Sequence, residues 1–354
     1  MITVTKTFLP PQEEYNKILK RAWDAGWVTN RGILVQELEQ KLKTYLNVPQ
    51  VLATTNGTLS LQIAIKALGL KGEIITTPFS YVATTSTIIW EGCKPVFVDI
   101  HPEYLTIDET KIEAAITPDT TAILATHIFG NPCEVEEIER IAKKHNLKVI
   151  YDAAHAFGVK YKGESIFNYG DISACSFHAT KLFHTGEGGA LFTRDKSLME
   201  KLFYTHDFGH NGQEGFSGVG INAKMSEPQA AMGLTVLPYM EKILKDREQV
   251  ISTYRNEIRN LQFLKIRPET DWNFSYFPVI FPSEADLLNA IKILKKEDIV
   301  PRRYFYPSLD TLPYIKRSAD SISMDISSRI LCLPLFTDFP DQDLKKVISI
   351  MNSL

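Results

Sequence analysis

The chain has 354 residues, of which 44% are hydrophobic, and its 39 basic and 42 acidic side chains give a formal net charge of −3. This length and apolar content predict one large domain with a smaller one beside it, while the balanced charge without a basic stripe argues against nucleic-acid binding. No apolar run approaches the ~20 residues of a membrane helix and no signal peptide is evident, so we expect a cytoplasmic protein without a membrane partner.

Two amphipathic helices are expected first. Residues 12–25 and 35–46 carry apolar residues at intervals of three and four, which is the period of a helix with one buried face. Gly26 and Gly32 lie in the loop between them.

From about residue 51, short strand-like runs alternate with helix-like runs. We predict strands at 73–77, 94–100, 121–127, 147–152, 172–177 and 189–193, and helices at 58–68, 108–116, 134–145 and 196–206. Thr106 and Glu109 have the spacing of a capping box for the second of these helices. The alternation predicts an α/β fold in which helices sandwich a mostly parallel central sheet.

The C-terminal third has a different composition. A long helical stretch covers residues 226–262. It is followed by a predicted strand at 273–281, a helix at 283–297, a strand-like run at 329–336 and a closing helix from Asp341. We therefore predict a large domain over residues 1–245 and a small α+β domain over residues 246–354.

Neither a disulfide framework nor a metal site is expected. Four cysteines are scattered along the chain at Cys93, Cys133, Cys175 and Cys332. They form no C-x-x-C pair, which is typical of reduced thiols in a cytoplasmic protein. His206 and His210 are four residues apart, but no acidic third ligand has suitable spacing, so we expect no bound metal.

Lys181 stands in the stretch SFHATKLFHTGEGGALF (176–192), between a strand-like run and several glycines. One interpretation is a loop lysine whose ammonium lies in water. The other is a lysine whose pKa is lowered by partial burial, so that its free amine can attack a carbonyl and form a Schiff base. The second interpretation requires a carbonyl cofactor and a phosphate-binding site nearby.

A possible phosphate site lies at Gly57 and Thr58, where a strand-like stretch meets an apolar helix. Backbone amides at a helix N-terminus can bind an anion, and a glycine there lets the anion come close. An ordinary helix N-cap, formed by Thr58 or Ser60, remains an alternative at this point.

Asp152 ends a predicted buried strand, at the edge where parallel α/β sheets bind ligands. An unpaired buried carboxylate is costly, so Asp152 needs a cationic partner such as a protonated pyridine nitrogen, unless it merely caps a helix. His155 is a candidate for contacting the same ligand or a packed histidine, and Ser176 can offer a hydroxyl to a phosphate. This order of an anion site, a strand-end acid and Ser-x-x-x-x-Lys resembles pyridoxal-phosphate enzymes of the aspartate-aminotransferase fold (fold type I).

Seven motifs spread over nearly the whole chain resemble the DegT/StrS-type sugar aminotransferases, which make amino sugars from nucleotide-linked keto sugars. They are GWVTNRG (26–32), TNGTLSL (55–61), TPFSYVATTSTIIWEGCKPVFVDI (77–100), YDAAHAFG (151–158), SFHATK (176–181), EGGAL (187–191) and GINAKMSEPQAA (220–231). Within the family the motifs look most like transaminases that form dTDP-4-amino-4,6-dideoxyhexoses. Amination of a 3-keto sugar remains the alternative.

The resemblance implies pyridoxal 5'-phosphate as the cofactor and assigns its catalytic residues. Lys181 would form the Schiff base and move the proton between cofactor and substrate carbons. Asp152 would pair with the pyridine nitrogen, Tyr81 would stack on the ring, and His155 would lie near the phenolic oxygen.

The same resemblance implies a shared site. Gly57, Thr58 and Ser176 would hold the phosphate together with Asn222 of a neighbouring subunit, which implies a homodimer. The amino donor would be L-glutamate and the acceptor a nucleotide-linked keto sugar, in a ping-pong cycle. Lys224 departs from the family, since arginine is frequent there.

Two other functions compete with sugar transamination. A non-catalytic regulator that binds pyridoxal phosphate would need an appended DNA-binding segment, and the two enzyme-like domains use the whole chain. A pyridoxal-phosphate enzyme acting on amino acids would show a carboxylate-binding arginine in the small domain, and Arg302 and Arg303 are candidates. The retained Lys181 favours transamination over dehydration, since the family's dehydratases carry histidine instead.

Overall fold

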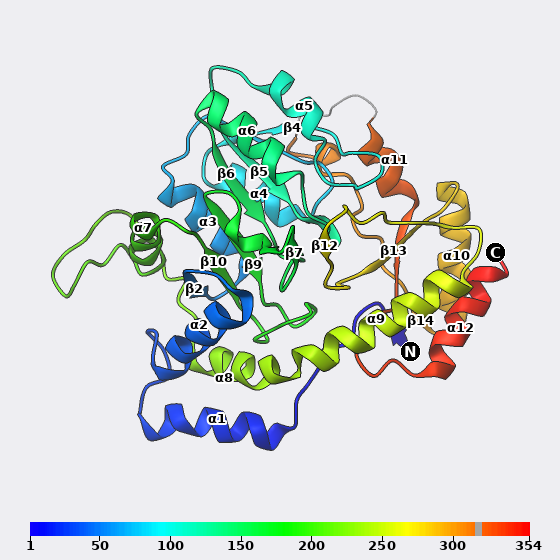
Figure 1. Cartoon of the computed structure of the whole chain (residues 1–354), viewed down its shortest axis with the longest axis horizontal. Coiled ribbons are helices and arrows are strands. Elements are labelled where there is room, and N and C mark those ends of the chain that lie inside the picture. Colours follow the sequence, from blue (N-terminus) through cyan, green and yellow to red (C-terminus); the bar gives the residue numbers. More distant parts are fainter. Residues whose placement is uncertain (316–320) are drawn as a thin grey trace.

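The computed structural model describes residues 1–315 and 321–354 (Figure 1). In this part of the chain a seven-stranded sheet has the order β2-β10-β9-β6-β5-β3-β4. Its strands are β2 (Val51–Thr54), β3 (Glu73–Thr76), β4 (Lys94–Phe97), β5 (Thr120–Thr126), β6 (Lys148–Asp152), β9 (Ile172–Ser176) and β10 (Gly189–Phe192). Strand β10 runs antiparallel to both neighbours, and the other pairs are parallel. The predicted α/β fold with a mostly parallel sheet is confirmed.

Helices cover the sheet at the predicted places, with one addition. The flanking helices are α3 (Gly57–Ala67), α4 (Val82–Trp90), α5 (Glu109–Ile112), α6 (Val135–His145) and α7 (Lys196–His206). Helix α4 was not predicted, because its sequence VATTSTIIW is rich in β-branched residues, which favour strands. In the described residues no helix is both long and apolar enough to cross a bilayer.

The capping-box prediction for α5 was wrong. Asp108 occupies the N-cap position and accepts a 3.2 Å hydrogen bond from the backbone N–H of Thr110. Thr106 is buried two residues earlier, so Asp108 supplies the cap instead. The helix is also shorter than predicted, since α5 ends at Ile112 and a 3-10 turn covers Glu113–Ala115.

Helices α1 (Gln12–Asp24) and α2 (Ile33–Leu46) pack against α8 (Glu227–Val236), and the three lie together in Figure 1. The fully buried Glu227 joins two of them, because its carboxylate accepts the backbone N–H groups of Leu34 at 2.7 Å and Val35 at 3.1 Å. These are N–H groups of the first turn of α2, which have no partner inside the helix. A buried carboxylate therefore caps α2 from a distant part of the sequence.

The predicted helical stretch at 226–262 is divided in two. A 3-10 turn at Leu237–Tyr239 separates α8 from α9 (Met240–Glu257). Met240 and Ile243 belong to the core beneath the large sheet, whereas Val250, Ile251 and Tyr254 belong to a second core. The domain boundary at 245/246 stays a prediction, and the change of core falls within α9.

The second core lies around an antiparallel sheet in the order β11-β13-β15. The elements are β11 (Gln262–Phe263), β13 (Phe277–Ile280), β15 (Ile330–Leu333), α10 (Glu284–Lys296), α11 (Ile322–Arg329) and α12 (Asp341–Asn352). Two short pairings cross the predicted boundary. Strand β1 (Ile2–Thr3) pairs with β14 (Ile299–Val300), and β12 (Thr270–Asp271) pairs with β7 (Lys160–Tyr161), which also pairs with β8 (Glu164–Ser165).

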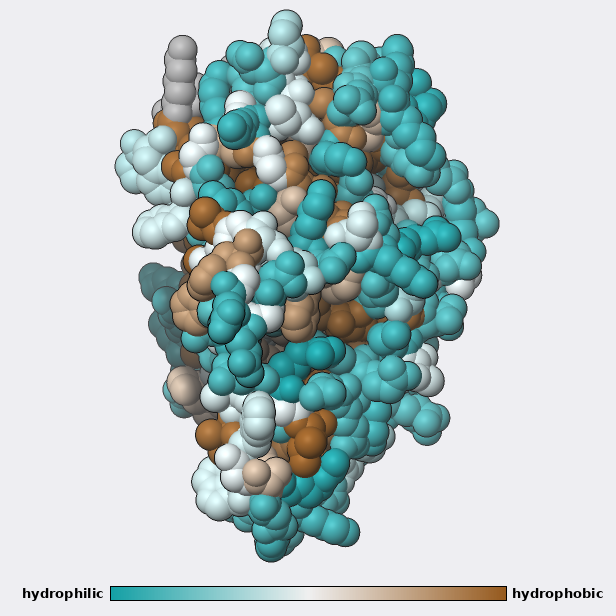
Figure 2. Space-filling view, turned by 90° about the vertical axis from the view of Figure 1, so that its left-hand side faces the viewer, coloured by the Kyte–Doolittle hydropathy of each residue, from teal (hydrophilic) through white to brown (hydrophobic). Residues whose placement is uncertain are grey.

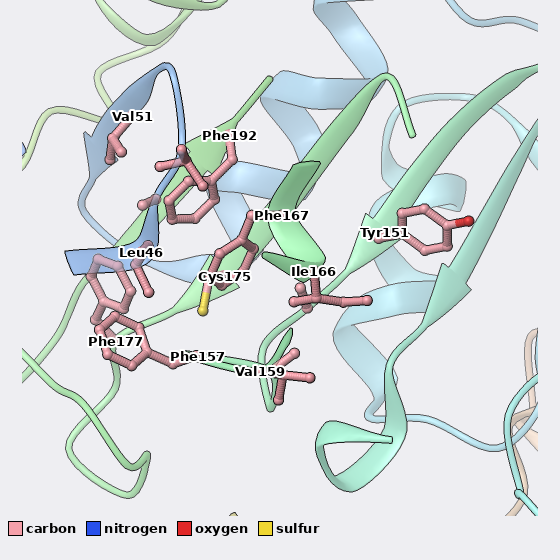
Figure 3. Close-up of a cluster of buried hydrophobic side chains, with 14 of the residues drawn as sticks. Leu46, Val51, Tyr151, Phe157, Val159, Ile166, Phe167, Cys175, Phe177 and Phe192 are labelled. Atoms are coloured by element: carbon pink, nitrogen blue, oxygen red, sulfur yellow. The ribbon is translucent and has the colours of Figure 1, made fainter. Parts of the chain in front are cut away.

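Buried aromatic side chains support the strands that lead to the site (Figure 3). Phe167 stacks on Phe192 of β10 with ring centroids 4.1 Å apart, and Phe157 meets Phe177 edge-to-face at 5.9 Å. Phe177 directly follows β9 and is fully buried. Full burial of such a side chain is worth about 1.5–3 kcal/mol, so this core holds the end of β9 in place.

Candidate active site

A cavity of about 290 Å³ opens where β5, β6 and β9 end. Thr126, Asp152 and Ser176 are the last residues of these strands, and all three line the cavity. Seven of the eight predicted site residues line it, namely Gly57, Thr58, Tyr81, Asp152, His155, Ser176 and Lys181. The carboxyl edge of a parallel sheet is the usual ligand site of such folds.

Asn222, the eighth predicted residue, does not line the cavity. Its side chain is exposed, and its backbone pairs with Asp207 beside the long loop that follows α7. Lys224 forms an ion pair with Asp207 and lies over the ring of Phe208 at 4.7 Å. Within one copy of the chain, neither Asn222 nor Lys224 reaches the site.

The N-terminus of α3 forms one corner of the cavity. Asn56 caps the helix, since its side chain accepts the N–H of Leu59 at 2.8 Å, and the hydroxyl of Ser60 is bonded to Thr54 at 2.6 Å. Thr58 therefore does not cap the helix, and it is exposed. A Cβ on Gly57 would come within 2.9 Å of Ser176 Cβ, so glycine is needed for this close approach. Backbone N–H groups and two hydroxyls thus meet in a corner suited to phosphate.

Asp152 is buried, and two donors hold its carboxylate. The hydroxyl of Thr84 donates at 2.6 Å and the N–H of Ala154 at 3.1 Å. Burial raises the pKa of Asp152, and these hydrogen bonds act in the opposite direction. Asp152 is followed by turns, not by a helix, so the helix-capping alternative was wrong. A buried carboxylate with neutral donors on one side fits a cationic ring nitrogen on the other.

A chain of hydroxyls extends behind Asp152. Ser80 lies 2.7 Å from the hydroxyl of Thr84 and 3.0 Å from that of Thr126. These three residues line or support the cavity, and sequence reasoning missed all of them. Ser80 and Thr84 lie in the motif at 77–100, and Thr126 lies near the end of the strand predicted at 121–127. These positions were the signal by which the three residues could have been found.

Lys181 is half-buried, and its amine lies inside the cavity. Burial lowers the pKa of Lys181, and the nearby Tyr304 and Asp152 partly oppose that shift. The only side-chain hydrogen bond of its amine in the described residues goes to the hydroxyl of Tyr276, at 3.4 Å. A lysine in this setting has more free amine at neutral pH than one in water.

His155 is buried, and burial lowers its pKa well below the ordinary value. The backbone N–H of Phe129 donates to its Nδ1 at 3.1 Å. Nδ1 is therefore the acceptor of the neutral ring and Nε2 carries the proton. The ring stacks on Phe305 with centroids 5.6 Å apart. His155 can offer a ligand an N–H donor without a charge.

Tyr81 is 51% exposed and directly precedes α4. Its ring meets Phe305 edge-on, with centroids 6.4 Å apart. Tyr81 therefore forms a wall of the cavity with a face available for stacking, and that role remains a prediction.

The two candidate arginines differ in position. Arg303 lies outside the cavity lining and binds Glu284 and the carbonyl of Ser328, each at 2.7 Å. Arg302 lines the cavity, and its guanidinium lies 4.4 Å from the ring centroid of Tyr304. Among residues 1–315 and 321–354, Arg302 has no carboxylate within salt-bridge distance.

The two histidines considered for metal binding have other neighbours. Nδ1 of His206 is hydrogen-bonded to the carbonyl of Phe203, and the ring of His210 rests on Phe216. In the part of the chain that the structure describes, no three His, Cys, Asp or Glu side chains are grouped to hold a metal ion. All four cysteines are buried and free.

Comparison with known proteins agrees with this geometry. Residues 11–352 match the DegT/DnrJ/EryC1/StrS aminotransferase family. A dTDP-4-amino-4,6-dideoxy-D-glucose transaminase of Shigella dysenteriae is 41% identical over 362 residues, covering 100% of this chain and 99% of that protein. One of Escherichia coli is 38% identical over 365 residues, covering 99% and 98%. The crystal structure of DesI in the presence of its TDP-sugar product has a TM-score of 0.94 at 31% identity and covers 99% of this chain and 92% of that one.

Proposed function

This chain belongs to the DegT/DnrJ/EryC1/StrS aminotransferase family, and on that premise we propose that it transfers the amino group of L-glutamate to dTDP-4-keto-6-deoxyglucose. The product would be the 4-amino-4,6-dideoxy sugar, a building block for polysaccharides. Two relatives at 41% and 38% identity carry the name of this transaminase. The observation that carries the proposal is one cavity in which the amine of Lys181, the carboxylate of Asp152 and the N-terminus of α3 meet.

The residues present fit pyridoxal 5'-phosphate. Gly57, Thr58 and Ser176 would hold its phosphate, because a side chain on Gly57 would close the corner in which they meet. Asp152 would hold the protonated ring nitrogen, and Lys181 would anchor the cofactor covalently. When bound, the cofactor supplies a ring that withdraws electrons from the substrate carbon.

The protein's own groups would then move the proton. With its pKa lowered by burial, the amine of Lys181 can take a proton from one substrate carbon and return it at another position. Positioned acid–base catalysis of this kind is worth about 10²–10⁴-fold. The Nε2–H of His155 would orient the ligand by donating a hydrogen bond, and the carboxylate of Asp152 would keep its partner nitrogen protonated.

L-Glutamate as donor is supported by Arg302. Its guanidinium borders the cavity and has no carboxylate partner in the described residues. It can therefore bind the α-carboxylate of the donor through two parallel hydrogen bonds, in a bidentate contact. An amino sugar does not need this contact, but an amino-acid donor does.

We further propose a homodimer in which Asn222 completes the partner's phosphate site. The loop that carries Asn222 exposes Phe208, Phe216 and Val219, which are 48%, 67% and 73% exposed. Figure 2 views the molecule from the side on which this loop projects in Figure 1, and hydrophobic patches reach the surface there between hydrophilic ones. Exposed apolar surface of this kind is typical of a protein–protein contact.

Two measurements test the proposal. Borohydride reduction of the freshly purified protein should fix a pyridoxyl group on Lys181, detected by peptide mass spectrometry. Incubation with L-glutamate and a panel of 3-keto and 4-keto nucleotide sugars should yield amination of the dTDP-4-keto sugar. Labelling at another lysine would overturn the site, and preferential amination of a 3-keto sugar would overturn the proposed position of the amine.

A further inference from the structure

The segment Trp272–Tyr276 is bound to the loops that follow β5 and β6. Trp272 Nε1 and the hydroxyl of Ser275 both donate to the carbonyl of Phe129 at 2.8 Å. The side-chain amide of Asn273 donates to the carbonyls of His155 at 2.8 Å and Phe157 at 2.9 Å. Two side-chain hydrogen bonds to Phe129 and two to the loop that contains His155 therefore hold this segment in place.

A buried arginine holds the same segment from the opposite side. Arg247 of α9 donates to the carbonyl of Phe274 at 2.9 Å and to that of Ser275 at 2.6 Å. Arg247, Asn273 and Ser275 are all buried, at 6%, 2% and 5% exposed. Buried hydrogen bonds are costly to break, so the position of the backbone just before Tyr276 is well determined.

This backbone holds Tyr276 beside two residues of the cavity, Lys181 and His155. It is 3% exposed, its hydroxyl lies 3.4 Å from the amine of Lys181, and its ring centroid is 4.8 Å from that of His155. Burial raises the pKa of Tyr276, so its hydroxyl stays neutral and can accept a hydrogen bond from the lysine ammonium.

We propose that Tyr276 is the positioning residue of Lys181, and that the segment Trp272–Tyr276 uses it to set the orientation and proton affinity of the amine. The hydroxyl oxygen stabilises the charged form and so opposes the effect of burial. Tyr276 and Lys181 lie on opposite sides of the predicted domain boundary. The contact therefore makes the basicity of the amine depend on how the C-terminal domain is positioned against the large domain. This inference rests on the proposed role of Lys181.

The test measures the amine directly in the full-length protein freed of cofactor. Trace acetic anhydride is applied across a range of pH, and acetylation of the Lys181 peptide is quantified by mass spectrometry. Replacing Tyr276→Phe removes only the hydroxyl and should lower the apparent pKa of Lys181, raising its reactivity at a given pH below that pKa by about tenfold. Tyr254→Phe is the matched control, since this buried tyrosine donates to the carbonyl of Pro334 and does not line the cavity.

A second variant shows whether the result holds if Tyr276→Phe disturbs the fold. Asn273→Ala keeps every tyrosine but removes both bonds to the carbonyls of His155 and Phe157, and should shift the profile in the same direction by a smaller amount. Profiles that superimpose on the wild type for both variants would overturn the inference, as would an equal shift in Tyr254→Phe. Borohydride trapping is scored separately: if Lys181 is trapped but the profile does not move, only the role of Tyr276 fails.

Discussion

The hydroxyl of Thr84 donates a 2.6 Å hydrogen bond to Oδ2 of Asp152, although Thr84 lies on a helix and Asp152 at the end of a central strand. The bond orients a buried carboxylate toward the cavity. The carboxylate that would serve the cofactor's ring is therefore held by a residue from a different element.

Removing this bond should weaken cofactor binding. Thr84→Val keeps the shape but leaves the carboxylate with one donor fewer, and a hydrogen bond to a charged group is worth about 1.5–3 kcal/mol. We expect at least a tenfold loss of affinity for pyridoxal phosphate, measured by titrating the cofactor's visible absorbance. Thr85→Val is the control, because Thr85 is equally buried and its hydroxyl makes no hydrogen bond in the described residues. Equal affinities in the two variants would contradict a role for Thr84.

Lys181→Ala should lose at least a thousandfold in turnover, because it would remove both the proposed covalent anchor and the group proposed to move the proton. The cofactor should still bind through its phosphate. Initial rates with L-glutamate and the keto sugar provide the measurement, and the exposed Lys201→Ala serves as the control. A near-normal rate would remove Lys181 from the mechanism.

Arg302→Gln should raise the KM for L-glutamate at least tenfold and leave the KM for the nucleotide sugar nearly unchanged. The reason is that the variant would lose the proposed bidentate contact with the α-carboxylate. The two half-reactions can be followed separately by the absorbance of the cofactor. Arg303→Gln is the control, since Arg303 is bound to Glu284 outside the cavity. If the KM for the sugar rises instead, Arg302 recognises the phosphates of the nucleotide.

Asn222→Ala should be inactive, because we propose that Asn222 completes the phosphate site of the partner subunit. Mixing two inactive variants tests this. If Asn222 acts in the partner's site, a heterodimer of Lys181→Ala and Asn222→Ala has one site with both changes and one intact site. Unfolding and refolding the two inactive variants together should restore about a quarter of the wild-type activity, as random pairing of a twofold dimer requires. No recovery, with dimers demonstrated, would place Asn222 in its own subunit's site or outside any site.

His127 should make the protein sensitive to acid. Burial, and then the charge of Arg267, lower the pKa of His127 from 6.5 to about 3. Below pH 6.5 the unfolded chain takes up a proton that the folded chain refuses, so stability falls as the pH decreases toward 3. Between pH 7 and 5 this should cost about 2 kcal/mol. Between pH 7 and 5, the free energy of unfolding of His127→Gln, measured with urea, should therefore fall by about 2 kcal/mol less than that of the wild type. If the two proteins lose stability in parallel, His127 is not the source of the acid sensitivity.

The order of the elements and most of the cavity residues could be predicted from the sequence alone. Alternating apolar strands and helices predicted a parallel sheet, with Asp152 at the end of one strand and Ser176 near the end of another, at 172–177. Because parallel strands end at the same edge, these residues had to lie near each other, and a glycine at the start of α3 could approach them. These are local patterns, so they can be recognised without knowing the tertiary contacts.

Which residues hold the candidate catalytic groups depends on tertiary contacts. Thr84 is 68 positions from Asp152, Tyr276 is 95 from Lys181, and Asn273 is 118 from His155. The choice between the adjacent Arg302 and Arg303 likewise depended on which side chain the loop turned into the cavity. Side-chain directions at such separations result from tertiary packing, and no periodicity along the chain predicts them.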